Sequence, residues 1–263
     1  MIALLWLAGC GGPCGGDQPC TVGDRTYYAL PPEGWDGESK LPTVIYAHGY
    51  GGSPHQYYSD PEVVTAFSDA GVLLLLPEAQ GRGWSTNEGG DATDDLDFMA
   101  DMLDDVDQTW PTDPDQRVMA GFSIGAAMTY AVACYESDLF SAAYPMSGGF
   151  WAPLPSACDG PPLRLGDEHG MEDGTWPLGG RVLFGDAVQG DPIQSFDMLM
   201  HMDGCTGEPV ETFLDEFSCA EWTSCDDGVV ARFCFHDGKH ERMDGWEQRL
   251  ISFSLPDVGA VSR

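Results

Sequence analysis

Residues 121–125 carry the feature that most constrains this chain. They read Gly-Phe-Ser-Ile-Gly, a G-x-S-x-G pattern centred on Ser123. Such a serine sits on a sharp turn between a strand and a helix, and its neighbours are small because larger side chains would collide with those elements. Residues 115–120 predict a mostly apolar strand, and residues 126–134 are small and apolar, as in a buried helix. We therefore predict that Ser123 is an exposed nucleophile; the alternative is a purely structural turn.

Strand and helix signals alternate along the chain, which predicts an α/β fold with a mostly parallel central sheet and helices on both faces. A continuous apolar run at residues 72–76 suits a strand buried on both faces. Further strands are expected at residues 25–30, 41–47 and 229–235, and helices at residues 61–69 and 91–106. We expect residues 1–24 to form an export segment and a Gly/Cys-rich tether, and residues 25–263 to form a single catalytic domain.

The chain is strongly acidic. It has 11 basic and 43 acidic residues among 263, for a formal net charge of −32. Such a surface repels nucleic-acid phosphates and anionic lipid headgroups. This excludes nucleic acid as a partner and indicates a well-solvated globular protein, which we expect to be a monomer.

The N-terminus and the cysteines predict export. Residues 7–10 read Leu-Ala-Gly-Cys and resemble a bacterial lipobox, in which Cys10 would be lipidated and would tether the protein to a membrane. The alternative is the remnant of an ordinary secretion signal. The eight other cysteines are an even number, which favours disulfides and a secreted, periplasmic or cell-surface location. Their spacing assigns no pairs, and it lacks the compact patterns of a zinc site, the rival interpretation.

A nucleophilic serine needs a base, an acid that orients the base, and N–H donors for an oxyanion. Residues 48–52, His-Gly-Tyr-Gly-Gly, follow a predicted strand and predict an oxyanion turn, although a plain glycine-rich turn is the alternative. The donors would be the backbone N–H groups of Tyr50 and Ile124. For the base we favour His240, in the loop beyond the last predicted strand, with His236 in reserve.

The acid should lie between Ser123 and the base in chain order. Aspartate is abundant in this region, so composition does not choose among the candidates. They are Asp167, Asp173, Asp186, Asp191 and Asp197.

Several segments in the same order are similar to the secreted polyhydroxybutyrate depolymerase and feruloyl esterase group of the α/β-hydrolases. They are the H-G-x-x-x-S turn at 48–53, Leu76-Pro77, Trp84, the D-D-x-x-F helix start at 94–98, the D-x-x-R-V segment at 114–118, the elbow at 121–125, D-L-F-x-A-A at 138–143, H-G-x-x-D-x-x-x-P at 169–177, Gly204-Cys205 and the final G-x-H at 238–240. The chain departs from the group at Ile124 and Ala126, and its segment at 166–168 is unusually polar for a strand.

The resemblance implies an α/β-hydrolase fold and a serine esterase. It carries the role of acid to Asp173 and supports His240 as the base. The implied substrates are a polyester such as polyhydroxybutyrate, or feruloyl and acetyl esters of plant polysaccharides. Neither a metal nor an organic cofactor is required. We also expect Trp84, Trp151 and Trp176, in or near the predicted active-site loops, to bind substrate.

Two other classes of function remain open at this point. One is a non-catalytic surface lipoprotein of the same fold that binds a ligand. The other is a serine peptidase, although amide substrates generally call for an added domain or lid, and the sequence shows none.

Overall fold

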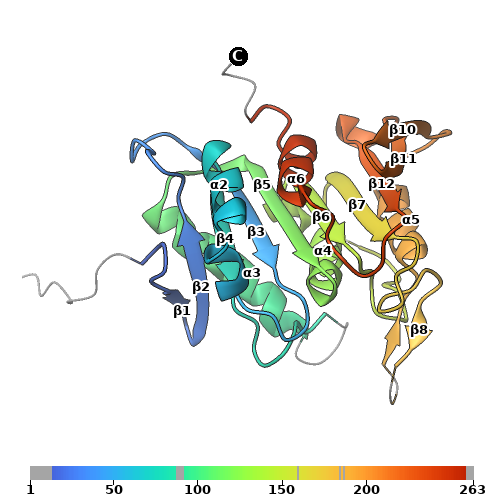
Figure 1. The fold of residues 1–263 in the computed structure, drawn as a ribbon, viewed down its shortest axis with the longest axis horizontal. Coiled ribbons are helices and arrows are strands. Elements are labelled where there is room, and N and C mark those ends of the chain that lie inside the picture. The colour runs from blue at the N-terminus through green and yellow to red at the C-terminus, as the bar shows by residue number, and fades with distance from the viewer. Residues whose placement is uncertain (1–13, 87–91, 159, 184, 186, 259–263) are drawn as a thin grey trace, which may run out of the picture.

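A computed structural model describes residues 14–86, 92–158, 160–183, 185 and 187–258. Ten strands form one sheet (Figure 1). Their spatial order is β1 (Cys20–Val22), β2 (Arg25–Leu30), β4 (Leu73–Pro77), β3 (Leu41–Ala47), β5 (Thr112–Phe122), β6 (Ala142–Met146), β7 (Arg164–Gly170), β12 (Ala231–His236), β11 (Phe217–Trp222) and β10 (Val210–Leu214). The six strands from β4 to β12 are parallel, and antiparallel pairs flank them on both sides.

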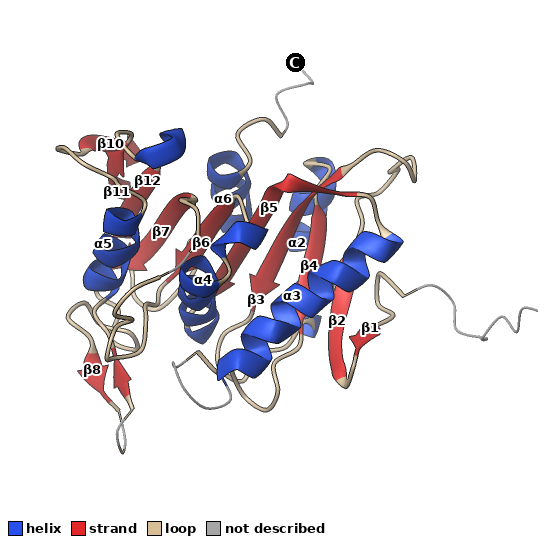
Figure 2. Ribbon diagram, turned by 180° about the vertical axis from the view of Figure 1, so that it is seen from behind, coloured by secondary structure: helices blue, strands red, loops and turns tan. Residues whose placement is uncertain are grey.

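Helices cover both faces of the sheet, as the sequence predicts. Figure 1 shows α2 (Pro61–Asp69) and α6 (Trp246–Ser254) on one face. Figure 2 shows α3 (Ala92–Thr109), α4 (Ile124–Tyr135) and α5 (Pro192–Met202) on the other. Further short elements are α1 (His55–Tyr58), the small hairpin of β8 (Arg181–Val182) and β9 (Val188–Gln189), and two 3-10 turns, Ser137–Leu139 and Asp226–Gly228.

Successive side chains of a strand point to opposite faces of the sheet. Because helices cover both faces, the side chains of the central strands are buried on both sides. In β4, Leu73 and Leu75 join the apolar cluster that includes the α3 side chains. Leu74 and Leu76 join a second cluster with side chains of α2 and α6. A continuous apolar run is therefore the pattern that this position requires.

The polar segment at 166–168 lies within β7, where its carboxyl groups are buried with partners. Asp167 Oδ2 accepts a hydrogen bond from the Tyr130 hydroxyl at 2.6 Å. Glu168 accepts two from the Arg249 guanidinium, at 2.7 and 2.9 Å, and one from Tyr144. A buried carboxylate such as that of Glu168 is tolerated when it is paired with a cation in this way.

Four disulfides cross-link the described chain. They join Cys14 to Cys20, Cys134 to Cys158, Cys205 to Cys225, and Cys219 to Cys234. The last pair links the neighbouring strands β11 and β12. Such cross-links are typical of proteins that work in oxidising compartments.

The domain begins earlier than the predicted boundary at residue 25. Residues 20–22 form the edge strand β1, which pairs with β2, and Cys20 is buried in the core. The Gly- and Cys-rich composition of this segment suggests a tether, but the pairing of β1 with β2 and a hydrogen bond from the Gly16 N–H to the Ala29 carbonyl hold it against the sheet. Cys10, the predicted lipidation site, lies outside the described residues. Within the part of the chain that the structure describes, no helix has the length and hydrophobicity needed to cross a bilayer.

Candidate active site

Ser123 lies on a strained turn between β5 and α4. Its backbone φ of 60° and ψ of −119° fall in a region that non-glycine residues rarely adopt. The turn is supported from both sides, because Ser123 N–H donates to the Met146 carbonyl at 2.9 Å and Ser123 O accepts from the Ala126 N–H. Strain of this kind persists only where the surrounding structure imposes it, and it is common at active sites. The predicted strand, turn and helix are thus present.

The flanking glycines are required by close backbone contacts. A Cβ atom on Gly125 would lie 2.0 Å from the Ala47 carbonyl oxygen, at the end of β3. One on Gly121 would lie 2.3 Å from the carbonyl oxygen of Gly125. The small residues of the motif therefore allow α4 to approach the end of β3, and they place Ser123 beside residues 48–49.

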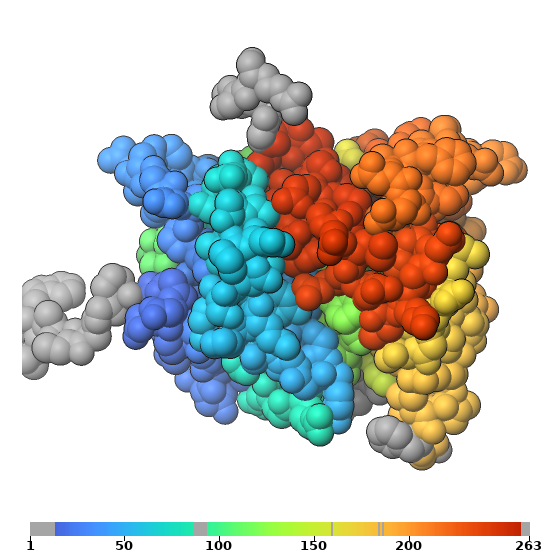
Figure 3. All heavy atoms as spheres, in the orientation of Figure 1, coloured from blue at the N-terminus to red at the C-terminus, as the bar shows by residue number. Residues whose placement is uncertain are grey.

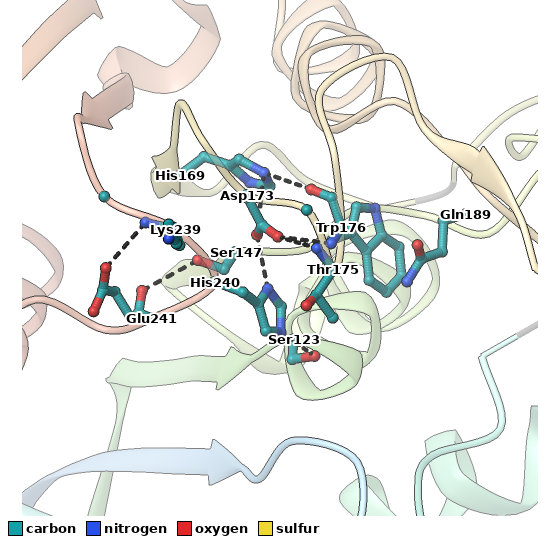
Figure 4. Close-up of polar contacts among 12 residues, drawn as sticks. Ser123, Ser147, His169, Asp173, Thr175, Trp176, Gln189, Lys239, His240 and Glu241 are labelled. Atoms are coloured by element: carbon teal, nitrogen blue, oxygen red, sulfur yellow. Dashed lines mark hydrogen bonds and ion pairs between the residues drawn. The ribbon is translucent and has the colours of Figure 1, made fainter.

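Three side chains from distant segments form one hydrogen-bonded chain at the carboxyl ends of the parallel strands. His240 Nε2 lies 2.8 Å from Ser123 Oγ, and His240 Nδ1 lies 2.7 Å from Asp173 Oδ2 (Figure 4). His240 comes from the loop after β12, and Asp173 from the loop after β7. With Asp173 ionised, Nδ1 carries a proton and donates a hydrogen bond to the carboxylate, so that Nε2 is free to accept the Ser123 hydroxyl proton.

The acid is held ionised by its own loop. The Asp173 side chain is fully buried, and burial alone would raise its pKa. The hydrogen bond with His240 and the N–H groups of Thr175 and Trp176 outweigh burial and hold the pKa below its ordinary value. Those two N–H groups donate to Oδ1 at 2.8 and 2.7 Å, which leaves Oδ2 for the histidine. The loop thus fixes the orientation of the carboxylate.

The two predicted oxyanion donors have no other partner. Among the described residues, neither the Tyr50 N–H nor the Ile124 N–H donates a hydrogen bond. Ile124 is the first residue of α4, where the helix leaves its N–H groups unsatisfied and carries partial positive charge. A Cβ on Gly49 would lie 3.5 Å from the Ser123 Cβ, so the turn before Tyr50 lies against the serine.

An open pocket of about 430 Å³ contains Ser123 and His240. Its walls combine the glycine-rich turn with three aromatic rings and a few polar side chains. The lining residues are Gly49, Tyr50, Gly51, Gly52, Gln56, Tyr57, Phe122, Ser123, Thr175, His240 and Arg242. Space of this size beside a nucleophile can hold an aromatic or a sugar-sized group.

The predicted tryptophan contacts differ from the structure. Trp84 is 4% exposed and Trp176 is 1% exposed, and neither lines the pocket that contains Ser123 and His240, so their predicted role in substrate binding has no support there. The Trp84 indole N–H donates to the His48 carbonyl at 2.9 Å, and the ring packs beside the His48 ring. The Trp176 indole N–H donates to the Gly190 carbonyl at 3.0 Å. Both rings are therefore buried beneath active-site loops and hydrogen-bond to backbone carbonyl groups there.

Trp151 also lies away from the pocket walls. It is half-buried, its ring packs edge-on against Trp176 at a centroid distance of 5.3 Å, and its backbone bridges to Gln189. Its predicted role in substrate binding therefore has no support from the pocket.

The reserve base, His236, lies inside the protein. It is 2% exposed, it packs against the Phe217 ring, and its Nδ1 accepts the Gly238 N–H at 3.1 Å. Among the other candidate acids, Asp167 pairs with Tyr130, and Asp191 caps α5 by accepting the Ile193 N–H.

Among the candidate acids that the structure describes, Asp173 is the one that contacts His240. Asp197 lies within α5, and Asp186 falls outside the described residues.

Sequence reasoning missed several residues of the pocket wall. Tyr57, Phe122 and Arg242 all line it. Phe122 is the variable residue before the serine in the motif, and Arg242 lies two residues beyond His240, so proximity in sequence was an available signal. Tyr57 lies on α1, and nothing local distinguishes it. In the described residues, no cluster of three or more metal-ligating side chains occurs.

A profile of the alpha/beta hydrolase family matches residues 44–252. The match covers most of the chain, and it includes Ser123, Asp173 and His240. The chain therefore belongs to the alpha/beta hydrolase family.

Curated relatives include several feruloyl esterases. A probable feruloyl esterase C of Aspergillus terreus is 28% identical over 228 residues, covering 84% of this chain and 77% of its own. Feruloyl esterase C of Emericella nidulans is 26% identical over 270 residues, covering 97% of this chain and 92% of its own. Feruloyl esterase B of Piromyces equi is 27% identical, but this chain spans only 44% of its length. Together with the family match, these relatives identify the chain as a hydrolase of the esterase type.

The fold of this chain is also similar to that of a solved structure. The acetyl xylan esterase from Aspergillus awamori superposes with a TM-score of 0.63 over 88% of this chain and 94% of its own, at 13% identity. At that identity the likeness speaks for the fold alone.

Proposed function

We propose that this protein is a serine carboxylic-ester hydrolase that acts through Ser123, His240 and Asp173. The observation that carries the proposal is the unbroken chain of hydrogen bonds from Asp173 through His240 to Ser123 Oγ. A serine hydroxyl needs such a base to become nucleophilic, and the base needs such an acid to hold the reactive tautomer.

The reaction would proceed in two steps. His240 takes the Ser123 proton as Oγ attacks the ester carbonyl, and the N–H groups of Tyr50 and Ile124 stabilise the oxyanion. His240 then gives its proton to the departing alcohol oxygen, which leaves an acyl group on Ser123. A water molecule, deprotonated by the same histidine, hydrolyses that acyl group and restores the hydroxyl. Asp173 orients His240 and stabilises its positive charge throughout.

We infer that the acyl group is a hydroxycinnamate such as ferulate, carried on a carbohydrate. Two lines of support lead in this direction: the names of the curated relatives, and the aromatic pocket walls formed by Tyr50, Tyr57 and Phe122. Flat apolar walls favour an aromatic acyl group over a small acetyl group. The polyester alternative has no comparable support here.

We also propose that the enzyme works outside the cytoplasm. The four disulfides fit an oxidising compartment. Lipidation of Cys10 stays a prediction from the lipobox-like sequence.

Steady-state hydrolysis of methyl ferulate tests this proposal. The wild type and Ser123→Ala are compared, with Ser252→Ala as the matched control because Ser252 is exposed on α6 and does not line the pocket. We expect Ser123→Ala to lose at least about 10⁴-fold in kcat, since the nucleophile is absent, and Ser252→Ala to keep its activity.

Other outcomes would redirect the proposal. Turnover of 4-nitrophenyl acetate without turnover of methyl ferulate would keep the esterase and reject the feruloyl substrate. Turnover of feruloyl amides at a comparable rate would favour the peptidase. No difference between the wild type and Ser123→Ala would leave a ligand-binding protein.

A further inference from the structure

Arg242 is a charged side chain in the pocket that the proposed reaction does not use. It lies in the loop between His240 and α6 and lines the same pocket as Ser123. Figure 3 shows this face, with the red C-terminal segment that contains α6 lying against the cyan segment that contains α2. A positive charge in the pocket of the proposed nucleophile is unusual in a chain whose net charge is −32.

Aromatic rings hold the Arg242 guanidinium in place. Its central carbon lies 5.0 Å from the ring centroids of both Tyr57 and Trp246, 5.5 Å from that of Phe122 and 5.9 Å from that of Tyr46. Cation–π attraction acts over such distances and fixes a guanidinium without neutralising it. The Arg242 guanidinium is therefore already held in place before a substrate binds.

Most of its hydrogen-bonding capacity is unused. A guanidinium has five N–H donors. Among the described residues, it makes a single hydrogen bond, from Nη1 to the Tyr46 hydroxyl at 3.3 Å. None of its nitrogen atoms is both buried and unpartnered, so the remaining donors reach solvent.

Four other arginines of the described chain form ion pairs with carboxylates. Arg249 forms a two-point ion pair with Glu168, Arg25 lies 2.6 Å from Asp95, and their charges are thereby neutralised. Arg242 forms no ion pair with any described carboxylate. Glu247 is close enough to influence it, but it lies beyond ion-pair distance.

Further positive charge surrounds the same pocket. The exposed Arg82 guanidinium lies 4.8 Å above the ring of Tyr50, a pocket residue, and the exposed Lys239 adjoins His240. No carboxylate is among the described residues that line the pocket, so its walls differ from the strongly acidic chain as a whole. Local positive charge attracts anions.

We propose that Arg242 is a specificity-determining residue that binds a carboxylate carried by the ester substrate. The planar fork of a guanidinium matches a carboxylate in two parallel hydrogen bonds, and such charge-assisted bonds are the strong ones. The substrate class is thus an ester with an acidic group within reach of its scissile bond, on either the alcohol or the acyl part. This inference rests on the proposed esterase reaction.

Matched esters that differ only in charge test the proposal. For the alcohol part, 4-acetoxybenzoate is compared with 4-acetoxybenzamide; for the acyl part, monomethyl terephthalate is compared with methyl 4-carbamoylbenzoate. We expect the wild type to prefer the carboxylate in one pair by about ten- to a hundredfold in kcat/KM. The pair that shows the preference identifies the part of the substrate that Arg242 binds.

Variants then assign the preference to Arg242. Arg242→Gln should bring the carboxylate-to-amide ratio close to one, and Arg242→Lys should keep part of it because the charge remains. Lys40→Gln removes an exposed charge from the loop before β3, at the edge of the sheet opposite to Ser123, and should leave the ratio unchanged. Comparing ratios cancels the intrinsic difference between the two leaving groups.

The possible results distinguish a failure of the role proposed for Arg242 from a failure of the proposed esterase function. Equal wild-type turnover of both members of each pair would overturn the role of Arg242 while leaving the esterase intact. A preference that survives in a folded Arg242→Gln would overturn it as well. If that variant does not fold, the wild-type ratio and the Arg242→Lys ratio still decide. Wild-type activity indistinguishable from that of Ser123→Ala on every ester would instead reject the proposed function.

Discussion

At the scale of single residues, the proposed reaction depends on the orientation of His240. Its two ring nitrogens face different partners, and only the tautomer with the proton on Nδ1 leaves Nε2 free to accept from Ser123. Asp173 selects that tautomer because its carboxylate can only accept at Oδ2, while the Thr175 and Trp176 N–H groups occupy Oδ1.

Replacing that carboxylate by an amide should reverse the tautomer. In Asp173→Asn, the amide can donate to Nδ1 and place the proton on Nε2, so we expect kcat for methyl ferulate to fall about 10⁴-fold while the fold persists. Asp167→Asn is the matched control, because burial raises the pKa of Asp167 well above its ordinary value and an amide oxygen there can still accept the Tyr130 hydrogen bond. Similar losses in both variants would contradict the assignment of Asp173.

At the scale of elements, the site depends on how closely α4 approaches β3. The contact is backbone to backbone, with the Gly125 Cα against the Ala47 carbonyl. No side chain can move aside to relieve a clash there. The strand-turn-helix unit is therefore a rigid support, and it explains how a serine can keep the strained backbone angles that the turn requires.

A single added methyl group should disrupt that support. We expect Gly125→Ala to lower the free energy of unfolding by about 3 kcal/mol, because its Cβ would lie 2.0 Å from a carbonyl oxygen. Gly174→Ala is the control: a Cβ there would meet no atom within 4 Å, so its stability should be unchanged. Urea unfolding of the three proteins measures the difference, and equal midpoints would show that the turn tolerates the extra atom.

At the scale of the whole molecule, features set by local sequence could be predicted, whereas features that depend on contacts between distant segments could not. The parallel core and the elbow follow from runs of apolar residues and from one short motif, because each of these signals lies within a few residues. The cysteine count predicted disulfides, yet the four pairs depend on which strands become neighbours. The early start of the sheet at Cys20 was missed for the same reason.

The limits of sequence reasoning are clearest around the pocket. Trp84 and Trp176 lie in the predicted active-site loops, but whether a ring points toward substrate or toward the core depends on packing by distant elements. Arg242 was missed although it is two residues from His240, since the rings that position it come from four separate parts of the chain. Chain order and resemblance were enough to choose Asp173 and His240.

The hydrogen-bonded chain exists only when the complete domain is folded, since Ser123 and His240 are 117 residues apart in sequence. The most direct measurement of the central claim is therefore intact-protein mass spectrometry after treatment with a fluorophosphonate, which reacts with serines that an adjacent base activates. We predict one adduct per chain, mapped by peptide sequencing to Ser123 and absent from a folded His240→Asn variant. No adduct on the folded wild type, or an adduct that persists in His240→Asn, would contradict the account.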